Sequence, residues 1–336
     1  MAYQFKIFIY SICLIACTET LLAQKVKLLS SGTQSSLRGL SVVNDRIIWV
    51  SGSNGMVGKS LDSGKTFIWQ LVKGYEKTEF RDIEAFNDTT AVIMGISSPA
   101  YILRTTDGGA NWKKVYENNA PGMFLDAMEF LNEQNGMVIG DPIEGKVFIA
   151  NTFDGGITWK NLPLQNNPIA DSGEAFFASS GTNIRKINQQ EAIFVSGGVS
   201  SHLFISGKKI LLPIVQGKQS TGANSIAVKN NKILIVVGGD FTTKDANTNS
   251  CFITKNAGKD WMAPKIPLHG YRSCVEWLSN KNWISCGLNG VDLSIDEGNR
   301  WDWISKESYH VVRKSKNGKA VFFAGAGGRI GKLIDF

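Results

Sequence analysis

The sequence is poor in cysteine and in long apolar runs. It has five cysteines in 336 residues, and two of them, Cys13 and Cys17, lie in or beside the first apolar stretch. The other three are an odd number and too sparse for a disulfide scaffold or a zinc site. After that stretch, no apolar run reaches the roughly 20 residues that cross a bilayer. The sequence therefore predicts neither a metal site nor a transmembrane segment.

Runs of like charge are also absent. Lys and Arg number 36 against 29 Asp and Glu, a net charge of +7, and they are spread along the chain. A dispersed basic excess is typical of a solvated surface and does not predict nucleic-acid binding. With 43% hydrophobic residues, the chain can bury a sizeable core. We expect a folded monomer whose partner, if charged, is acidic.

The first 23 residues have the features of an export signal. Lys6 supplies a positive charge, and an apolar run of about ten residues follows it. Cleavage after Ala23 would leave one mature domain, residues 24–336, in the periplasm or outside the cell. Alternatively, the four residues that end at Cys17 resemble a lipoprotein box. The signal would then end at residue 16, and a lipid on Cys17 would anchor the protein in the envelope.

A turn motif of the form S/T-x-D-x-G-x-x-W occurs five times. In the clearest copy, Asp107 can accept hydrogen bonds from nearby backbone N–H groups, Gly109 can take a positive φ, and Trp112 can pack on the following strand. The Asp position is filled by Asp62, Asp107, Asp154, Asn256 and Asp296. An Asn in this position keeps the acceptor but loses the charge, which favours a structural turn over catalysis.

The spacing of the motif predicts blades of a propeller. Positions 62, 107, 154, 256 and 296 are 45, 47, 102 and 40 residues apart. A period in the forties suits a four-stranded blade, and the gap of 102 spans two periods, so we expect a degenerate unit with a hairpin at residues 203–209. Most units open with similar strands, at residues 37–42, 80–86, 124–130 and 271–277. An apolar strand that ends in Gly follows each, at residues 47–52, 91–95, 136–140 and 283–287.

The last unit lacks its fourth strand. Six units lie between Leu37 and about Lys306, and the tail holds strands at residues 310–314, 320–325 and 331–334. The apolar stretch at residues 25–29 has no unit of its own, so we expect it to complete the last blade and cover its open edge. The sequence thus predicts an all-β, seven-bladed β-propeller, or eight blades if residues 163–222 hide another.

Charged residues recur where the first strands begin, which in a propeller is one mouth of the central channel. Two interpretations stay open. The arginines hold blades in register by bonding carbonyls and carboxylates, or they form a mouth that binds an anion or peptide. The candidates are Arg38, Arg81 and Arg272 at one position, His310 at the matching place in the last unit, Arg185, and the carboxylates Asp82, Asp126 and Glu174.

Cys274 and Cys286 lie on consecutive strands of one unit. A hairpin centred on Asn280 would place them opposite each other, with Trp277 opposite Trp283 on the other side. A disulfide and a pair of buried thiols are both compatible with this arrangement.

Two glycine-rich stretches fall short of nucleotide-binding motifs. Residues 53–60 lack the first Gly of a phosphate loop, and residues 325–331 miss the dinucleotide pattern. Neither opens a helix whose N-terminus could face a phosphate. We therefore expect no cofactor.

The turn motifs, known as Asp-boxes, the first strands such as Phe80-Arg81-Asp82-Ile83, and the closing strand resemble exported propellers related to the photosystem II stability/assembly factor family. Such proteins are also described as BNR-repeat or sialidase-like. The resemblance covers residues 25–336. It implies a non-enzymatic scaffold or assembly factor that binds a protein or peptide, with Arg38, Arg81 and Arg272 as the matching candidates. Nothing in the sequence points to a photosynthetic host, so the photosystem role itself is not transferred.

The alternative function is a sialidase-like glycoside hydrolase. A sialidase needs a Tyr-Glu nucleophile pair, and no Tyr stands out here; the Arg-Ile-Pro stretch expected before the first turn motif is also missing. A hydrolase that works through two carboxylates could use Asp82 with Asp126 or Glu174. The distance between the two carboxyl groups would decide whether they can act as such a pair.

Overall fold

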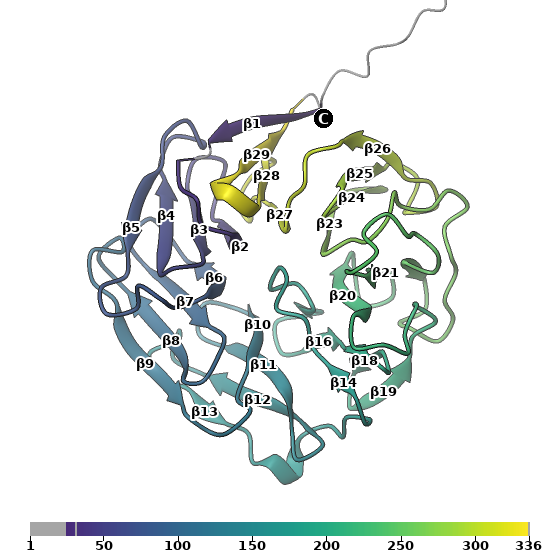
Figure 1. The fold of residues 1–336 in the computed structure, drawn as a ribbon, viewed down its shortest axis with the longest axis horizontal. Helices are drawn as coiled ribbons and strands as arrows, with labels where there is room; N and C mark the ends of the chain where they lie inside the picture. Colours follow the sequence, from purple (N-terminus) through teal and green to yellow (C-terminus); the bar gives the residue numbers. More distant parts are fainter. Residues whose placement is uncertain (1–24, 31, 335–336) are drawn as a thin grey trace, which may run out of the picture.

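The structure, a computed structural model, describes residues 25–30 and 32–334. The expected export signal and Cys17 lie outside the described residues. The described chain forms a ring of small antiparallel sheets, seen down its axis in Figure 1. In these two ranges, no helix is both long and apolar enough to cross a membrane.

The described residues form seven blades, and the first three are regular four-stranded sheets. Blade 1 contains β2 (Leu37–Val42), β3 (Ile48–Gly52), β4 (Met56–Ser60) and β5 (Ile68–Leu71). Blade 2 contains β6 (Phe80–Ala85), β7 (Ala91–Gly95), β8 (Ala100–Thr105) and β9 (Lys113–Asn118). Blade 3 contains β10 (Leu125–Phe130), β11 (Gly136–Ile143), β12 (Lys146–Thr152) and β13 (Lys160–Asn161).

The middle of the chain is less regular. A short helix, η1 (Leu164–Asn166), leads to blade 4, which contains β15 (Ile184–Lys186), β16 (Ala192–Val195), β18 (His202–Ile205) and β19 (Lys208–Leu211). Blade 5 contains β20 (Thr221–Val228), β21 (Leu234–Asp240) and β22 (Cys251–Thr254), joined by β14 (Glu174–Ala175) and β17 (Gly197–Gly198). The β18–β19 hairpin is the degenerate unit expected at residues 203–209. Residues 163–222 hold no additional blade, so seven is confirmed.

The first and last strands of the described residues meet in one sheet. Blade 6 contains β23 (Cys274–Ser279), β24 (Asn282–Gly287), β25 (Gly290–Ser294) and β26 (Asp302–Ser305). Blade 7 contains β27 (Val311–Lys314), β28 (Val321–Ala324), β29 (Ile330–Leu333), the short helix η2 (Ala326–Gly328) and β1 (Val26–Ser30). The purple β1 lies beside the yellow β29 in Figure 1, with Val26 opposite Leu333. The predicted closure is confirmed, and the last blade has no missing strand.

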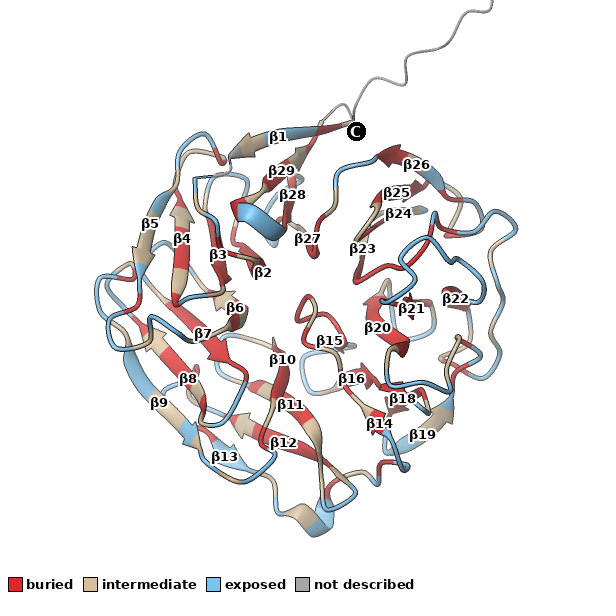
Figure 2. Cartoon of the chain, in the orientation of Figure 1, coloured by how far each residue is buried: buried red, intermediate tan, exposed pale blue. Residues whose placement is uncertain are grey.

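Apolar side chains between neighbouring blades hold the ring together. Every residue of β3 and β7 is buried, because these strands have partners in their own blade and blades on both sides. Figure 2 shows such buried positions in red around the whole ring. One apolar cluster runs from Val291 of blade 6 through Phe322 of blade 7 to Leu40 of blade 1, and it includes Val26 of β1.

The turn motif has the expected hydrogen bonds. The carboxylate of Asp107 accepts the backbone N–H of Asn111 at 2.9 Å and the hydroxyl of Thr105 at 2.8 Å. Gly109 has a φ of 92°, which favours glycine. The ring of Trp112 packs edge-on against Trp49 of blade 1, with centroids 6.4 Å apart, so the motif also joins two blades.

The two cysteines of blade 6 are cross-strand neighbours. Cys274 pairs with Cys286, and Trp277 pairs with Trp283, as predicted. Both cysteines are buried and are free thiols, so the structure has no disulfide between them. Cys274 Sγ instead accepts the backbone N–H of Val312 in blade 7 at 3.4 Å.

A loop fills the centre of the ring. Residues 176–183, here called the channel plug, lie between β14 and β15 and include buried residues near the centre of Figure 2. Gly181 has a φ of 63°, and a Cβ there would lie 2.3 Å from the Asp82 carboxylate, so only glycine fits. Plug atoms bond groups of four blades: Ser179 O to Arg38 (blade 1), Thr182 Oγ1 to Ser225 (blade 5), Ser180 Oγ to Ser273 O (blade 6) and Gly181 O to Arg313 (blade 7). The plug divides the channel into two separate ends.

We predict that β1 stabilises the ring through Val26. Val26 is 1% exposed in the core and Leu28 is 54% exposed in the same strand. Val26→Ala should lower the free energy of unfolding by about 2 kcal/mol because it leaves a cavity. Leu28→Ala is the control and should change it by less than about 0.5 kcal/mol. Denaturant unfolding of both variants checks this, and equal effects would show that β1 is not part of the core.

The turn motifs should contribute stability that acid removes. Hydrogen bonds, first those from Thr66 and Asn111 respectively, lower the pKa of Asp62 and that of Asp107 to about 2. A carboxylate with a lowered folded-state pKa stabilises the fold above its unfolded pKa, near 4, and loses this contribution as the pH falls toward 2. Asp62→Asn/Asp107→Asn should therefore melt below the unchanged protein at pH 6, and the difference should narrow at pH 2. A constant difference contradicts this role.

Candidate functional site

The innermost strands begin at one face of the ring, here called the start face, and their last residues line a pocket at the opposite face. A β-bulge lies near the beginning of several of these strands. The extra residue, which has no ladder partner, is Arg38 in β2, Arg81 in β6, Asp126 in β10 and Asn224 in β20. His310 directly precedes the first paired residue of β27. The bulge therefore places corresponding residues of different blades around one opening.

Five residues form this opening, here called the arginine mouth: Arg38, Arg81, Asn224, Tyr271 and His310. Arg38 Nη1 donates to Ser179 O of the channel plug at 3.2 Å. Asn224 Oδ1 accepts the Tyr271 hydroxyl at 2.8 Å and the Ser179 hydroxyl at 2.9 Å. Asn224, Tyr271 and His310 are buried, whereas both arginines are partly exposed. The mouth thus has a rigid polar floor and two guanidinium groups above it.

Positive charge at the arginine mouth is only partly neutralised. Burial and then the nearby charge of Arg81 lower the pKa of Arg38. Arg81 Nε is buried and has no hydrogen-bond partner among the described residues, and the nearest carboxylate, Glu79, lies 3.8 Å from it. Burial, Arg38 and Arg81 together lower the pKa of His310 to about 3, so this ring is neutral at pH 7. Two close cations with few acceptors favour an anionic ligand.

Asp126 belongs to this end of the channel but is not accessible. Its side chain is 0% exposed. Burial, and then the neighbouring Asp141 carboxylate, raise its pKa well above the ordinary value, although Arg81 acts in the opposite direction. Burial therefore favours the uncharged form of this carboxyl, which lies beneath the mouth.

The structure corrects the place of Arg272. In blade 6, Cys274 pairs with the residue that comes just before the Gly at the end of the second strand. In blade 1, Gly39 pairs with the residue at the same place. Ser273, and not Arg272, therefore corresponds to Arg38. A shift of one residue turns a side chain to the other face of its strand, so Arg272 points away from the mouth.

Arg272 instead forms a buried ion pair. Its guanidinium donates to the carboxylate of Asp292, with Nε 2.6 Å from Oδ2, and both side chains are 0% exposed. It also donates to the Tyr271 carbonyl at 2.8 Å and to Asn289. Arg272 thus bonds a carboxylate and a carbonyl, as one of the two interpretations expected, but these partners lie in its own blade 6 and do not join two blades.

Arg185 lies at the opposite end of the channel, which is a second correction. A pocket of about 390 Å³ there is lined by charged residues of the innermost strands. Arg185 Nη2 donates to Glu276 Oε2 at 3.1 Å, and its Nη1 lies 3.7 Å from Glu129. Lys316 likewise binds Glu84. These cations and carboxylates satisfy each other, so the pocket joins blades and keeps little charge for a ligand.

Asp82 is also removed from the mouth. It is 1% exposed, and its two oxygens accept the backbone N–H groups of Ile83 and Met128, each at 2.8 Å. Burial raises its pKa well above the ordinary value. Because Met128 is in blade 3, Asp82 joins two blades.

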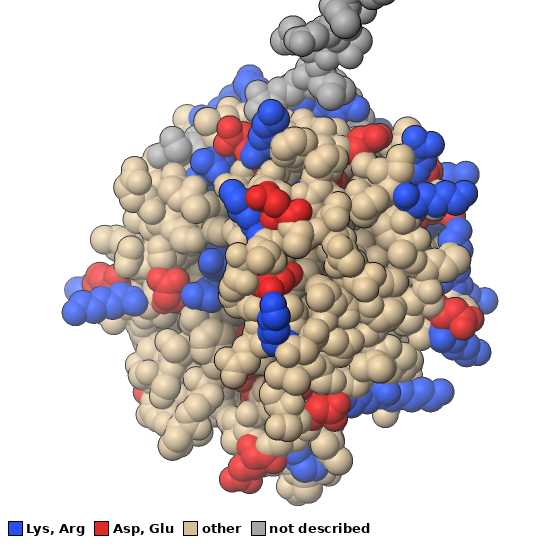
Figure 3. Space-filling view, turned by 45° about the vertical axis from the view of Figure 1, so that its right-hand side comes forward, with Lys and Arg blue, Asp and Glu red and all other residues tan. Residues whose placement is uncertain are grey.

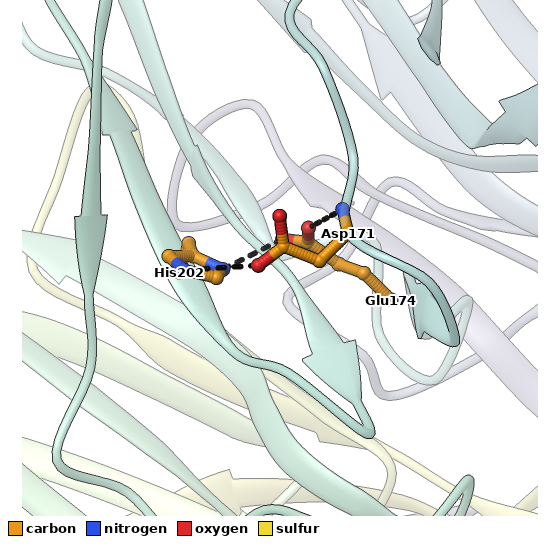
Figure 4. A group of neighbouring side chains, drawn as sticks. All are labelled: Asp171, Glu174 and His202. Atoms are coloured by element: carbon orange, nitrogen blue, oxygen red, sulfur yellow. Dashed lines mark hydrogen bonds and ion pairs between the residues drawn. The ribbon is translucent and has the colours of Figure 1, made fainter. Parts of the chain in front are cut away.

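Glu174 belongs to a separate cluster, drawn in Figure 4. Its Oε1 lies 3.1 Å from His202 Nδ1, and Asp171 Oδ2 lies 3.6 Å from His202 Nε2. This triad has the donor atoms of a metal site, but Lys209 Nζ already lies 2.7 Å from Asp171 and 2.8 Å from Glu174. Burial acts to raise the pKa of Glu174, yet hydrogen bonds from His202, Lys209 and Ser196 bring it below the ordinary value. The cluster holds the segment that leads into the plug.

Sequence reasoning missed the plug and the floor of the mouth. Asn224 and Tyr271 contribute through hydrogen bonds, and no motif marked them. Asn224 occupies the same bulge position as Arg38, but this match is visible only in the strand pairing of the structure. On the surface seen in Figure 3, positive and negative side chains lie interspersed.

No model of a known protein family matches this chain, and no curated protein matches its sequence. Solved structures do match. "YCF48 bound to D1 peptide" is 14% identical, with a TM-score of 0.65 over 93% of this chain and 97% of that one. "YCF48 from Cyanidioschyzon merolae" is 19% identical, with a TM-score of 0.65 over 92% and 98%. The Niastella koreensis GH74 enzyme is 13% identical, with a TM-score of 0.55 over 80% and 46%.

At these identities, the likeness establishes the fold alone. The chain is a seven-bladed β-propeller. The neighbours include a peptide-bound protein and an enzyme, so the site has to be judged from the residues of this chain.

We predict that Arg38 and Arg272 respond differently to the same substitution. Arg272→Gln leaves Asp292 as an unpaired buried charge and should cost about 3–5 kcal/mol of unfolding free energy. Arg38→Gln removes one hydrogen bond at a partly exposed position and should cost about 1 kcal/mol or less. Thermal and urea unfolding of both proteins measure this. Equal losses would mean that Arg38 is also a structural arginine.

Proposed function

We propose that this propeller is a non-catalytic scaffold that binds an acidic peptide segment of a partner protein at the arginine mouth. The observation that carries the proposal is the pair of Arg38 and Arg81, held close together with few acceptors of their own. A guanidinium group binds carboxylate oxygens through two parallel hydrogen bonds, which no neutral ligand can match.

The rigidity of the mouth supports this proposal. Arg38 and Arg81 are bulge residues on strands that are anchored in two blades, and Arg38 is also bonded to the plug. A ligand therefore does not have to order these side chains, which lowers the entropic cost of binding. The plug closes the channel beneath, so the bound segment lies on the start face and does not pass through the ring.

One of the similar structures contains this class of ligand, a peptide. The propeller of "YCF48 bound to D1 peptide" holds a peptide, and its fold covers 93% of this chain. The identity of 14% transfers no residue and no partner. It supports the proposal only in showing that a ring of this type can bind a peptide.

The proposed carboxylate pairs of the hydrolase alternative do not suit catalysis. Asp82 and Asp126 are 1% and 0% exposed, and Glu174 is bonded to His202, Lys209 and Ser196. A glycosidase needs two accessible carboxyl groups on either side of the bond that is cleaved. The arginine pair is the stronger basis for a function.

Binding of an acidic peptide tests the proposal. Arg38→Gln/Arg81→Gln should weaken the binding of a fluorescein-labelled, glutamate-rich peptide at least about tenfold, equivalent to 1.4 kcal/mol. Binding should also weaken with added salt, since exposed charges are screened. Fluorescence anisotropy measures both effects.

The matched control removes two other arginines. Arg46 and Arg300 are exposed and lie outside the mouth, so Arg46→Gln/Arg300→Gln loses the same charge and should keep the affinity. Melting curves show whether each variant is folded. The proposal fails if the two double variants bind the peptide equally well, or if the unchanged protein does not bind it.

A further inference from the structure

A second cavity opens on the start face, between the loops of blades 5, 6 and 7. Its volume is about 500 Å³. The cavity, here called the rim pocket, uses residues that follow β21 or precede β23 and β27, which are the ends of strands at the start face. The residues on which the argument depends are Lys244, His269, Asn289, Trp303, Lys306 and Arg329.

The rim pocket has a built aromatic wall. The ring of His269 stacks on Trp303, with centroids 4.7 Å apart and planes at 13°. Asp292 holds His269 in place, since its carboxylate accepts the backbone N–H and lies 3.3 Å from Nδ1. Asp292 is in turn fixed by the buried Arg272. The ion pair that removes Arg272 from the mouth therefore orients a ring in the neighbouring pocket.

The flat ring of His269 is available to a ligand. Its side chain is 47% exposed, although the ring is stacked on one side and bonded through Nδ1. Asn289, another wall residue, donates to Asp245 and to the His269 carbonyl, and it accepts from Arg272. The wall is thus held from several directions, while one face of the platform remains open to a planar group.

Positive charge around the rim pocket is in excess. Lys244 and Lys306 are exposed, and within the described ranges neither ammonium group forms an ion pair with a carboxylate. Lys306 lies over the Trp303 ring, with Nζ 5.5 Å from its centroid. Arg329 has a partner, because its Nε is 3.5 Å from Glu307. Asp245 also lines the pocket, where it accepts a hydrogen bond from Asn289. With three cationic and two acidic side chains in the lining, one positive charge is in excess and attracts an anionic group.

Backbone hydrogen bonds link a loop that lines the rim pocket to a strand of the arginine mouth. Leu37 donates its backbone N–H to Gly325 O at 3.1 Å, and Gly325 donates to Arg329 O at 2.9 Å. These bonds connect the strand of Arg38 with the loop that carries Arg329. Arg329 also helps to lower the pKa of His310 at the mouth, after burial and the two mouth arginines. A path of cationic groups thus leads from the mouth to the rim.

We propose that the rim pocket binds a second part of the same peptide: an acidic residue next to an aromatic or proline residue. The acidic side chain pairs with Lys244 and Lys306, and the ring lies on His269. This inference rests on the proposed function, since the mouth holds one acidic group of the peptide and the rim pocket the other. The bound peptide then has a defined direction, because it runs outward from the mouth over blades 6 and 7.

Two peptides separate the sites. The short peptide has about four residues, all but one of them acidic, and can occupy only the mouth. The long peptide has about 12 residues, spans roughly 40 Å when extended, and carries a Trp-Glu pair at its far end. Lys244→Gln/Lys306→Gln should weaken binding of the long peptide about tenfold and leave that of the short peptide unchanged. Arg38→Gln/Arg81→Gln should weaken both. Each peptide carries fluorescein, and anisotropy reports the affinity.

The control variant is Lys208→Gln/Lys232→Gln. Both lysines are exposed and lie at the opposite face, Lys208 as the first residue of β19 and Lys232 in the bend between β20 and β21, so this variant loses the same charge without touching the rim pocket. It should bind both peptides as the unchanged protein does. His269→Ala tests the platform and should reduce the preference for Trp over Ala in the long peptide.

The outcomes distinguish the two proposals. If the arginine variant loses both peptides but the Lys244→Gln/Lys306→Gln variant keeps the long one, the rim inference is wrong and the proposed function stands. If the unchanged protein binds neither peptide, the proposed function itself is wrong. If the lysine substitutions weaken the binding of the short and long peptides equally, the rim inference is also wrong, because the effect would then come from overall charge.

Discussion

The pairing of β1 with β29 is the contact on which the rest of the structure depends. It joins the first and last described strands in blade 7, with Val26 buried in a cluster that reaches blade 1. Each innermost strand then begins at a defined place around the channel. This rigidity explains how Arg38 and Arg81 stay close together, since two like charges on flexible loops would move apart.

The channel plug makes the two ends of the channel electrostatically different. At one end, Arg185 and Lys316 are paired with glutamates, and these pairs join blades. At the other, the arginines have few acceptors, and burial raises the pKa of the nearby Asp126. Burial therefore does more than hide this carboxyl group, because it also favours the uncharged form.

Local register decides whether an arginine is structural or available. Arg38 is the extra residue of a bulge, whereas Arg272 lies one position earlier relative to its ladder. The first is partly exposed at the mouth and the second is buried against Asp292. The buried pair still contributes to the surface, because it holds His269 against Trp303 in the rim pocket.

The sequence by itself determined the ring. Its five turn motifs, its period and its unmatched first strand predicted seven blades and their closure, because turns such as that at Asp107 depend on residues close together in the chain. The site depended on tertiary structure. A bulge shifts register by one residue without any mark in the sequence, so Arg38 and Arg272 looked alike. Only the packed ring decided which carboxylates are buried and which arginines are paired, because both depend on contacts between segments that are distant in the sequence.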